Sequence, residues 1–240
     1  MIDILTSGAS PQMIIIQIFV FLFVMLVALP LHEYAHGMTA KLLGDDTAEK
    51  SGRLTLNPIV HLDPMGAIAM LLFGIGWAKP VPVNPSRCTK VKPKAAMAIT
   101  ALAGPVTNLI LGFIAVIAAE CILYGNLDKI MIGEGKESLE WYLYAAAYYV
   151  ARINIYLAVF NMLPIPPFDG SRIFLSFLPT KLYFKVMRYE RVIMGVIMIL
   201  LITGIISLPL GFLTNAIMNG MVSAVDFVLF FLKIVPSVLS

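Results

Sequence analysis

Long apolar runs separated by polar or basic stretches divide this chain into segments of membrane-spanning length. Residues 12–31, 95–124 and 139–163 can each cross a hydrocarbon layer of about 30 Å as a helix, because a helix rises about 1.5 Å per residue. Residues 192–225 form an uncharged run of 34 positions with Pro209 near its middle. We interpret this last run as two short crossings joined at Pro209.

The first run is expected to remain in the mature protein. The residues before it carry only one charged side chain, Asp3, so the basic start of a signal peptide is missing, and no small-residue cleavage site follows. We expect the helix to continue through His36 to Leu43 and to end at Gly44, a residue type common just after helix ends. Pro30 predicts a kink, which membrane helices tolerate when neighbours cover the freed carbonyl.

Two shorter segments follow the first helix. Residues 51–58 alternate polar and apolar positions between turn residues, which predicts a short strand or an ordinary loop. A strand at 53–57 could pair with an extended peptide by strand addition. Residues 65–77 are apolar but too short to span, so they predict a re-entrant or interfacial segment. The expected fold is therefore an all-α multi-pass bundle of about five or six membrane segments with a short strand and re-entrant region.

The composition is that of an integral membrane protein. The chain is 60% hydrophobic and 13% charged, with a mean hydropathy of +0.90, whereas soluble domains carry about 25% charged residues. We expect residues 1–240 to form one membrane domain. The small net charge of +3 gives no reason to expect a nucleic-acid partner. Cys88 and Cys121 are expected on opposite sides of the bilayer, which excludes a disulfide between them.

Three ionisable side chains lie at the end of the first run, in His32-Glu33-Tyr34-Ala35-His36. Because the histidines are four residues apart, a helix projects both imidazoles from one face, where they can bind one zinc ion. Glu33 lies beside them, where a carboxylate can act as general base toward water. Charged groups in a membrane segment are costly and indicate function. The alternative is a pair of interfacial histidines.

Basic residues are unevenly distributed among the polar stretches. There are three at residues 41–53, five at 79–94, five at 172–191 and two at 125–140. Because cytoplasmic loops carry the excess of Lys and Arg, the first three stretches are expected on the cytoplasmic side. His32, His36 and Asp169 then all lie near the cytoplasmic face.

A catalytic zinc site needs a third protein ligand and leaves a fourth position for water. A histidine six residues after His36 is excluded because position 42 is Leu, and no Glu lies in the twenty residues after Lys50. Glu120 and Asp226 are expected at other depths. Asp169 is the best placed carboxylate, because three prolines brace the chain just before it.

Four other polar side chains have open roles. His61 and Asp63 could supplement the metal site or shape a turn. Asn108, next to a helix interruption at Gly104-Pro105, could join helices or face a substrate cavity. Arg152 should face the bundle interior, where it can find a partner or water.

These motifs resemble those of the site-2 protease family of intramembrane zinc metalloproteases. The similar stretches are residues 32–36, 76–85 (Gly-Trp-Ala-Lys-Pro-Val-Pro-Val-Asn-Pro), 103–108 (Ala-Gly-Pro-Val-Thr-Asn) and 161–170 (Asn-Met-Leu-Pro-Ile-Pro-Pro-Phe-Asp-Gly), and the likeness covers about residues 20–175. The resemblance implies one zinc ion held by His32, His36 and Asp169, with Glu33 as base. It also implies that Asn161 or Asn108 steadies substrate or oxyanion.

The resemblance further implies cleavage of a single-span membrane protein in or near its transmembrane segment, close to the cytoplasmic face. We expect a compact form, without PDZ or CBS domain, in a bacterial or archaeal cell membrane. One alternative is a catalytically silent scaffold or chaperone, which the intact Glu33 disfavours. The other is a metal transporter, which needs polar residues along a path through the bilayer, whereas here they cluster at one face. The pattern carries no indication of oligomeric state.

Overall fold

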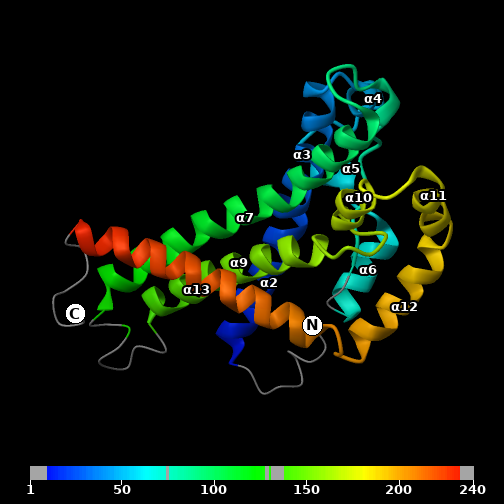
Figure 1. Cartoon of the computed structure of the whole chain (residues 1–240). Helices are drawn as coiled ribbons and strands as arrows, with labels where there is room; N and C mark the ends of the chain where they lie inside the picture. The colour runs from blue at the N-terminus through cyan, green and yellow to red at the C-terminus, as the bar shows by residue number, and fades with distance from the viewer. Residues whose placement is uncertain (1–9, 74–75, 128–129, 131–137, 233–240) are drawn as a thin grey trace.

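In the computed structural model, which describes residues 10–73, 76–127, 130 and 138–232, every regular element is a helix (Figure 1). The long helices are the continuous run α2 (Pro11–Phe23), η1 (Val24–Ala28) and α3 (Leu29–Leu42), together with α7 (Pro93–Gly125), α9 (Leu139–Asn161) and α13 (Ser207–Phe231). The short ones are α4 (Thr47–Lys50), α5 (Pro58–His61), α6 (Pro64–Phe73), η2 (Pro85–Arg87), α10 (Asp169–Leu175), α11 (Thr180–Arg188) and α12 (Glu190–Ile202).

Four helices among the described residues are long and apolar enough to cross a membrane: Pro11–Leu42, Pro93–Gly125, Leu139–Asn161 and Ser207–Phe231. The prediction of an all-α bundle is confirmed. The predicted number of membrane segments, about five or six, is higher than the four candidate spans found among the described residues. At 10 and 13 residues, α6 and α12 are shorter than the roughly 20 residues that one crossing requires.

The first long helix widens just before Pro30. Proline has no N–H, so the Leu26 carbonyl loses its usual helical donor. The backbone responds with the π-helical turn η1, in which the Leu29 amide donates to the Val24 carbonyl five residues earlier. The helix runs on as α3 to Leu42, and Gly44 follows with a φ of 109°. The predicted course, including an irregularity at Pro30, is confirmed.

Of the two alternatives for residues 51–58, the strand is wrong and the ordinary loop is confirmed. Within the described residues the only bridge between extended segments pairs Leu62 with Ala78. Side chains fix the 51–58 loop instead: Arg53 donates to the Lys79 carbonyl at 2.6 Å, and His61 Nε2 donates to the Thr55 carbonyl at 2.7 Å. The neighbouring segment 79–83 offers no regular ladder because its two prolines lack N–H donors.

The last apolar run also breaks at a different place from the one predicted. The turn between α12 and α13 lies at residues 203–206, where Gly204 adopts a φ of 76° that glycine accommodates readily. Pro209 lies in the first turn of α13, where a missing N–H costs nothing. The run therefore contains one short and one long helix.

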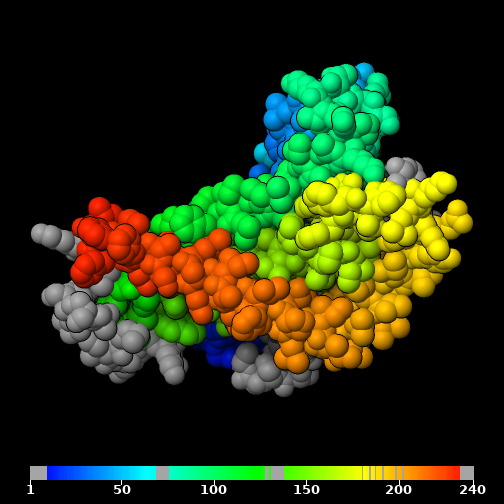
Figure 2. Space-filling view, in the orientation of Figure 1, coloured from blue at the N-terminus to red at the C-terminus, as the bar shows by residue number. Residues whose placement is uncertain are grey.

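The core forms where α7 packs along α9 and where α13 covers both (Figure 1). Val116, Ile155 and Met218 are buried there. The outer side of α13 remains uncovered in Figure 2, and Leu208 and Phe212 are 80% and 73% exposed. Apolar side chains on the outside suit a lipid environment.

Arg152 corrects another expectation, because its side chain is exposed and does not face the bundle interior. The inward stripe of α9 consists of Ala151, Asn154, Ile155 and Ala158, all buried. At 3.6 residues per turn these four positions span an arc of about 100° around the helix, and Arg152 lies outside that arc, beyond Ile155.

Candidate metal centre and active site

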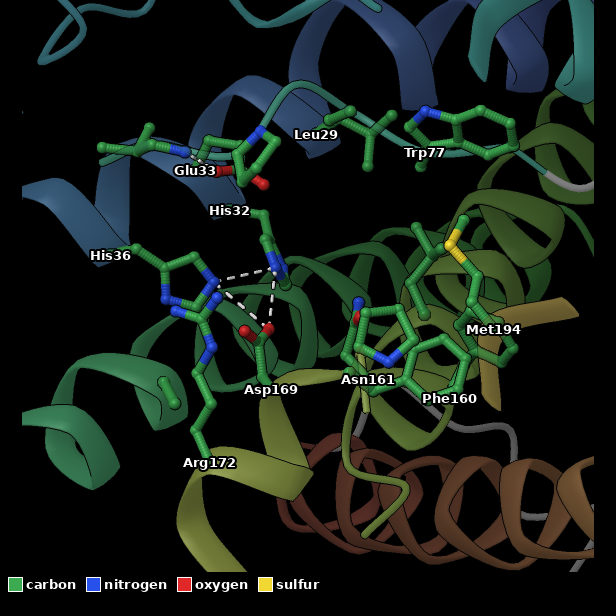
Figure 3. A pocket seen from close by; sticks show the side chains of 18 of the residues that line it. Leu29, His32, Glu33, His36, Trp77, Phe160, Asn161, Asp169, Arg172 and Met194 are labelled. Atoms are coloured by element: carbon green, nitrogen blue, oxygen red, sulfur yellow. Dashed lines mark hydrogen bonds and ion pairs between the residues drawn. The ribbon is translucent and has the colours of Figure 1, made fainter. Parts of the chain in front are cut away.

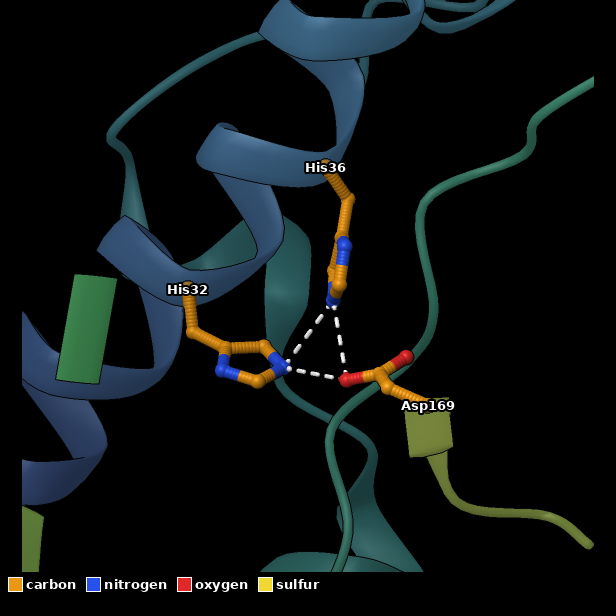
Figure 4. Close-up of side chains that lie close together, drawn as sticks. All are labelled: His32, His36 and Asp169. Atoms are coloured by element: carbon orange, nitrogen blue, oxygen red, sulfur yellow. Dashed lines mark hydrogen bonds and ion pairs between the residues drawn. The ribbon is translucent and has the colours of Figure 1, made fainter. Parts of the chain in front are cut away.

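Three side chains from two distant parts of the chain converge on one point (Figure 4). The Nε2 atoms of His32 and His36 on α3 lie 3.0 Å apart, and each lies 3.2 Å from Oδ2 of Asp169, the first residue of α10. Tetrahedral zinc with ligand bonds of about 2.0 Å separates its ligand atoms by roughly 3.3 Å. The triangle therefore has the size of a metal site.

The opposite nitrogen of each imidazole shows which atoms face that point. His36 Nδ1 lies 2.7 Å from the Thr100 carbonyl oxygen, which can only accept, so Nδ1 carries the proton. His32 Nδ1 lies 3.3 Å from Oδ1 of the buried Asn108. When Nδ1 is the protonated nitrogen of a neutral imidazole, Nε2 is left as an acceptor, so in that tautomer two Nε2 lone pairs face each other and a carboxylate. Such a group of acceptors fits a cation.

The carboxylate of Asp169 is well suited to that role. Burial raises the pKa of this carboxyl group, but positive charge beside it outweighs burial: protonated imidazoles of His32 and His36 hold the pKa below its ordinary value, and a metal cation in place of those protons would act in the same direction. Asp169 is thus ionised where it meets the two imidazoles.

The segment before Asp169 turns sharply rather than running straight. α9 ends at Asn161, and the chain passes through successive turns before α10 begins. A Cβ atom at Gly170 would lie 2.2 Å from the Met162 carbonyl oxygen, so only glycine allows this close return. The Phe160 and Phe168 rings, 4.4 Å apart, hold the two ends of the turn together.

Gly104 lets the backbone of α7 approach the imidazoles. A Cβ atom there would lie 2.4 Å from His36 Nε2 and 2.5 Å from His32 Cε1. Gly104-Pro105 predicted a helix interruption, which is wrong, because α7 is continuous across it. The signal that could have been used was a glycine at a small-residue helix contact, four residues before an asparagine.

Glu33 lies beside the metal group in a cavity of about 400 Å³ (Figure 3). The Val81 amide donates to Glu33 Oε2 at 2.8 Å, and the side chain is buried. His32, His36 and Asp169 line the same cavity. A carboxylate held next to a cation site in a sheltered space is the arrangement that general-base hydrolysis requires.

Comparison with known proteins identifies the family. The sequence pattern of peptidase family M50 matches residues 20–204. The chain belongs to this family. It is 39% identical to the Bacillus subtilis protein named "Putative zinc metalloprotease YwhC" over 195 residues, which cover 80% of this chain and 84% of that protein. The resemblance to the site-2 protease family is thereby confirmed.

More distant relatives have similar names. Rip2 of Mycobacterium tuberculosis is 30% identical over 147 residues, covering 60% of this chain and 52% of Rip2. MJ0611 of Methanocaldococcus jannaschii is 40% identical over 73 residues, covering 30% of each chain. Both are also named "Putative zinc metalloprotease". No solved structure matches the chain significantly.

In this M50 peptidase Asn161 and Asn108, the two asparagines considered for contact with substrate or oxyanion, occupy different places. Asn161 lines the cavity that contains Glu33. Asn108 is fully buried behind His32, on the side away from Nε2, and does not line that cavity. Asn108 therefore contacts a histidine, whereas Asn161 can contact a bound molecule.

The other polar residues considered in the sequence have local partners or lie elsewhere. His61 is bound to the Thr55 carbonyl, and Asp63 Oδ1 accepts from the Gly66 amide at 2.9 Å, so both shape the turn around α5 and α6. Among the described residues, the only group of three ligating side chains is His32, His36 and Asp169. Cys88 and Cys121 are both free, as predicted.

Proposed function

We propose that this chain is a zinc-dependent intramembrane endopeptidase that hydrolyses peptide bonds in or near transmembrane segments of membrane proteins. We assign His32, His36 and Asp169 as the ligands of one zinc ion and Glu33 as the general base. The observation that carries this proposal is the convergence of three acceptor atoms, 3.0 to 3.2 Å apart, inside the cavity that also holds Glu33.

Zinc in such a site supplies Lewis-acid activation of water and of a carbonyl group. The chain's own residues supply the proton transfer. Because the Val81 amide occupies Oε2 of Glu33, Oε1 is the atom left to accept a proton from the attacking water. The same carboxyl group can return that proton to the leaving amine, as general acid–base catalysis requires.

Further residues support the site without taking part in proton transfer. Asn108 and the Thr100 carbonyl fix the tautomer and orientation of the two histidines, as partners of metal-ligating histidines commonly do. We assign Asn161, at the cavity wall, to hold the substrate or the developing oxyanion.

The membrane setting supports a membrane-embedded substrate. Three of the four candidate spans contribute residues to the cavity that holds Glu33, and the motif lies within the first of them. The basic stretches that flank α3, α7 and α10 favour a cytoplasmic position of the site by the positive-inside rule. A helical substrate keeps its carbonyls in its own hydrogen bonds, so the bond to be cleaved must first be unwound.

The alternatives have less support. A metal transporter needs ligating groups at several depths, whereas the described residues hold one such group at one end of the bundle. A silent scaffold has no use for a carboxylate fixed at the rim of a metal group.

The test combines metal analysis of purified protein with cleavage of a panel of single-span substrates in vesicles. We expect about one zinc per chain and cleavage that a chelator abolishes and added zinc restores. Stoichiometric zinc with no cleavage of any span would overturn the proposal in favour of a scaffold.

A further inference from the structure

A second cavity, of about 670 Å³, adjoins the metal group and is lined by positive charge. It lies between η2, the start of α7, α10 and α11. Its charged lining residues are Lys92, Lys94 and Arg172, and its lining includes no Asp or Glu. Lys92 and Lys94 are exposed and Arg172 is half-buried, so the cavity presents charges of one sign, which attract the opposite charge.

The two cavities share a wall. Thr100 and Arg172 line both of them, and the Thr100 carbonyl also binds His36. Arg172 lies one helical turn after Asp169 on α10, and Figure 3 shows its side chain reaching toward the part of the site where His36 and Asp169 lie. A chain that leaves the metal group past Arg172 therefore enters the basic cavity.

The cations in this cavity have few partners of their own. Neither Lys92 nor Arg172 has an ion pair within the part of the chain that the structure describes. Lys94 Nζ donates to the Leu178 carbonyl at 2.6 Å, which steadies its ammonium group without neutralising it. Asp169 and Glu190 line the catalytic cavity together with Arg172, whereas no carboxylate of the described residues lines the basic cavity. Cations without an ion pair next to a site fit an anionic ligand that arrives with the substrate.

We propose that this basic cavity binds an acidic side chain of the substrate polypeptide, and so selects substrates with Asp or Glu a few residues from the cleaved bond. The inference rests on the proposed function and adds a specificity determinant to it. Carboxylate and phosphate both suit these cations. The wall shared with the catalytic cavity favours a carboxylate on the polypeptide over a lipid phosphate, because only the polypeptide must reach both cavities.

The test measures binding and cleavage in neutral phosphatidylcholine vesicles and, in parallel, in vesicles that also contain an anionic phospholipid. Substrates carry a single Glu, Gln or Lys, moved stepwise away from the cleaved bond. The enzyme variants are Lys92→Glu and, as a matched control, Lys90→Glu, which changes an exposed lysine that does not line the cavity. Arg172 is left intact because it also lines the catalytic cavity. Binding is measured on the Glu33→Gln background, so that it does not depend on turnover.

At one substrate position we expect Glu→Gln to weaken binding and raise KM about tenfold with little change in kcat, as loss of one charge-assisted hydrogen bond would. Lys92→Glu should weaken the preference for the Glu substrate, because only Lys94 and Arg172 then oppose the new carboxylate, whereas Lys90→Glu should behave as wild type. A preference that is the same in all variants would overturn the inference, and so would an effect of Lys92→Glu seen only with anionic lipids. Charge-dependent binding without any cleavage would instead overturn the proposed function alone.

Discussion

The backbone amide of Val81 donates a 2.8 Å hydrogen bond to Glu33 Oε2 across 48 positions of sequence. Val81 belongs to the extended segment that follows α6, whereas Glu33 lies on α3 next to the two histidines. The bond fixes the carboxylate at the cavity wall and leaves its other oxygen for proton transfer. Because Glu33 is held by Val81 and is not a member of the metal group, its role can be tested without changing a metal ligand.

Glu33→Gln is therefore expected to keep zinc and lose proteolysis. The amide preserves the acceptor for Val81 but cannot take up a proton, so kcat should fall by about 10²- to 10⁴-fold. Zinc content by mass spectrometry and cleavage rate are measured on the same preparation. Normal turnover with full zinc would show that another group is the base.

Asp169→Ala is expected to release zinc as well as abolish activity, because two histidines alone leave the site incomplete. Asp63→Ala is the control, since among the described residues the Asp63 side chain has one hydrogen bond, from the Gly66 amide, and lies outside the metal group. Both variants are dialysed against a weak chelator before zinc is counted. Retention of zinc by Asp169→Ala would mean that a different side chain completes the site.

Gly104→Ala should disrupt the metal group from outside the ligand set. The added methyl would lie 2.4 Å from His36 Nε2, so one of the imidazoles must move. The control is Gly220→Ala on α13, where a Cβ atom meets nothing within 4 Å. We expect the first variant to lose most of its zinc while thermal unfolding of the control is unchanged or shifted upward. Equal zinc in the two proteins would contradict the close approach of α7.

Asn108→Ala should weaken zinc binding without abolishing it. The substitution removes the acceptor for His32 Nδ1, and loss of such a partner typically costs about 10- to 100-fold in metal affinity. Asn154→Ala is a suitable comparison, because Asn154 is equally buried but, within the described part of the chain, its side chain bonds only to the Val150 carbonyl of its own helix. Competition with a fluorescent chelator gives both affinities. A loss of affinity shared by both variants would indicate a general effect of cavity formation.

Substrate helix stability is expected to control cleavage. Gly or Pro in the cytoplasmic third of a substrate span should raise the rate, and replacement by Leu should lower it, because the peptide bond must leave the substrate's own hydrogen bonds. Matched spans with the same substitutions in the opposite third are the control. Equal cleavage of poly-Leu and Gly-containing spans would remove unwinding from the mechanism.

Local spacing in the sequence was enough to predict much of the site. The i and i+4 positions of His32 and His36 fix both rings on one face of any helix that contains them. Basic residues flanking the spans placed Asp169 near the same face, and the prolines before it excluded a continuing helix. These inferences depend only on neighbouring residues, which is why they could be made without a structure.

The contacts that complete the site depended on tertiary structure. His36 meets the Thr100 carbonyl across 64 positions and His32 meets Asn108 across 76, and no periodicity relates such pairs. Packing of α3 against α7 decides which carbonyl faces an imidazole and why residue 104 must lack a side chain. Packing also explains two predictions that were wrong. The 51–58 segment is held by side-chain hydrogen bonds instead of a strand ladder, and Arg152 lies outside the buried stripe of α9. Sequence thus determined which residues share a helix face, whereas the crossing of the helices determined what that face meets.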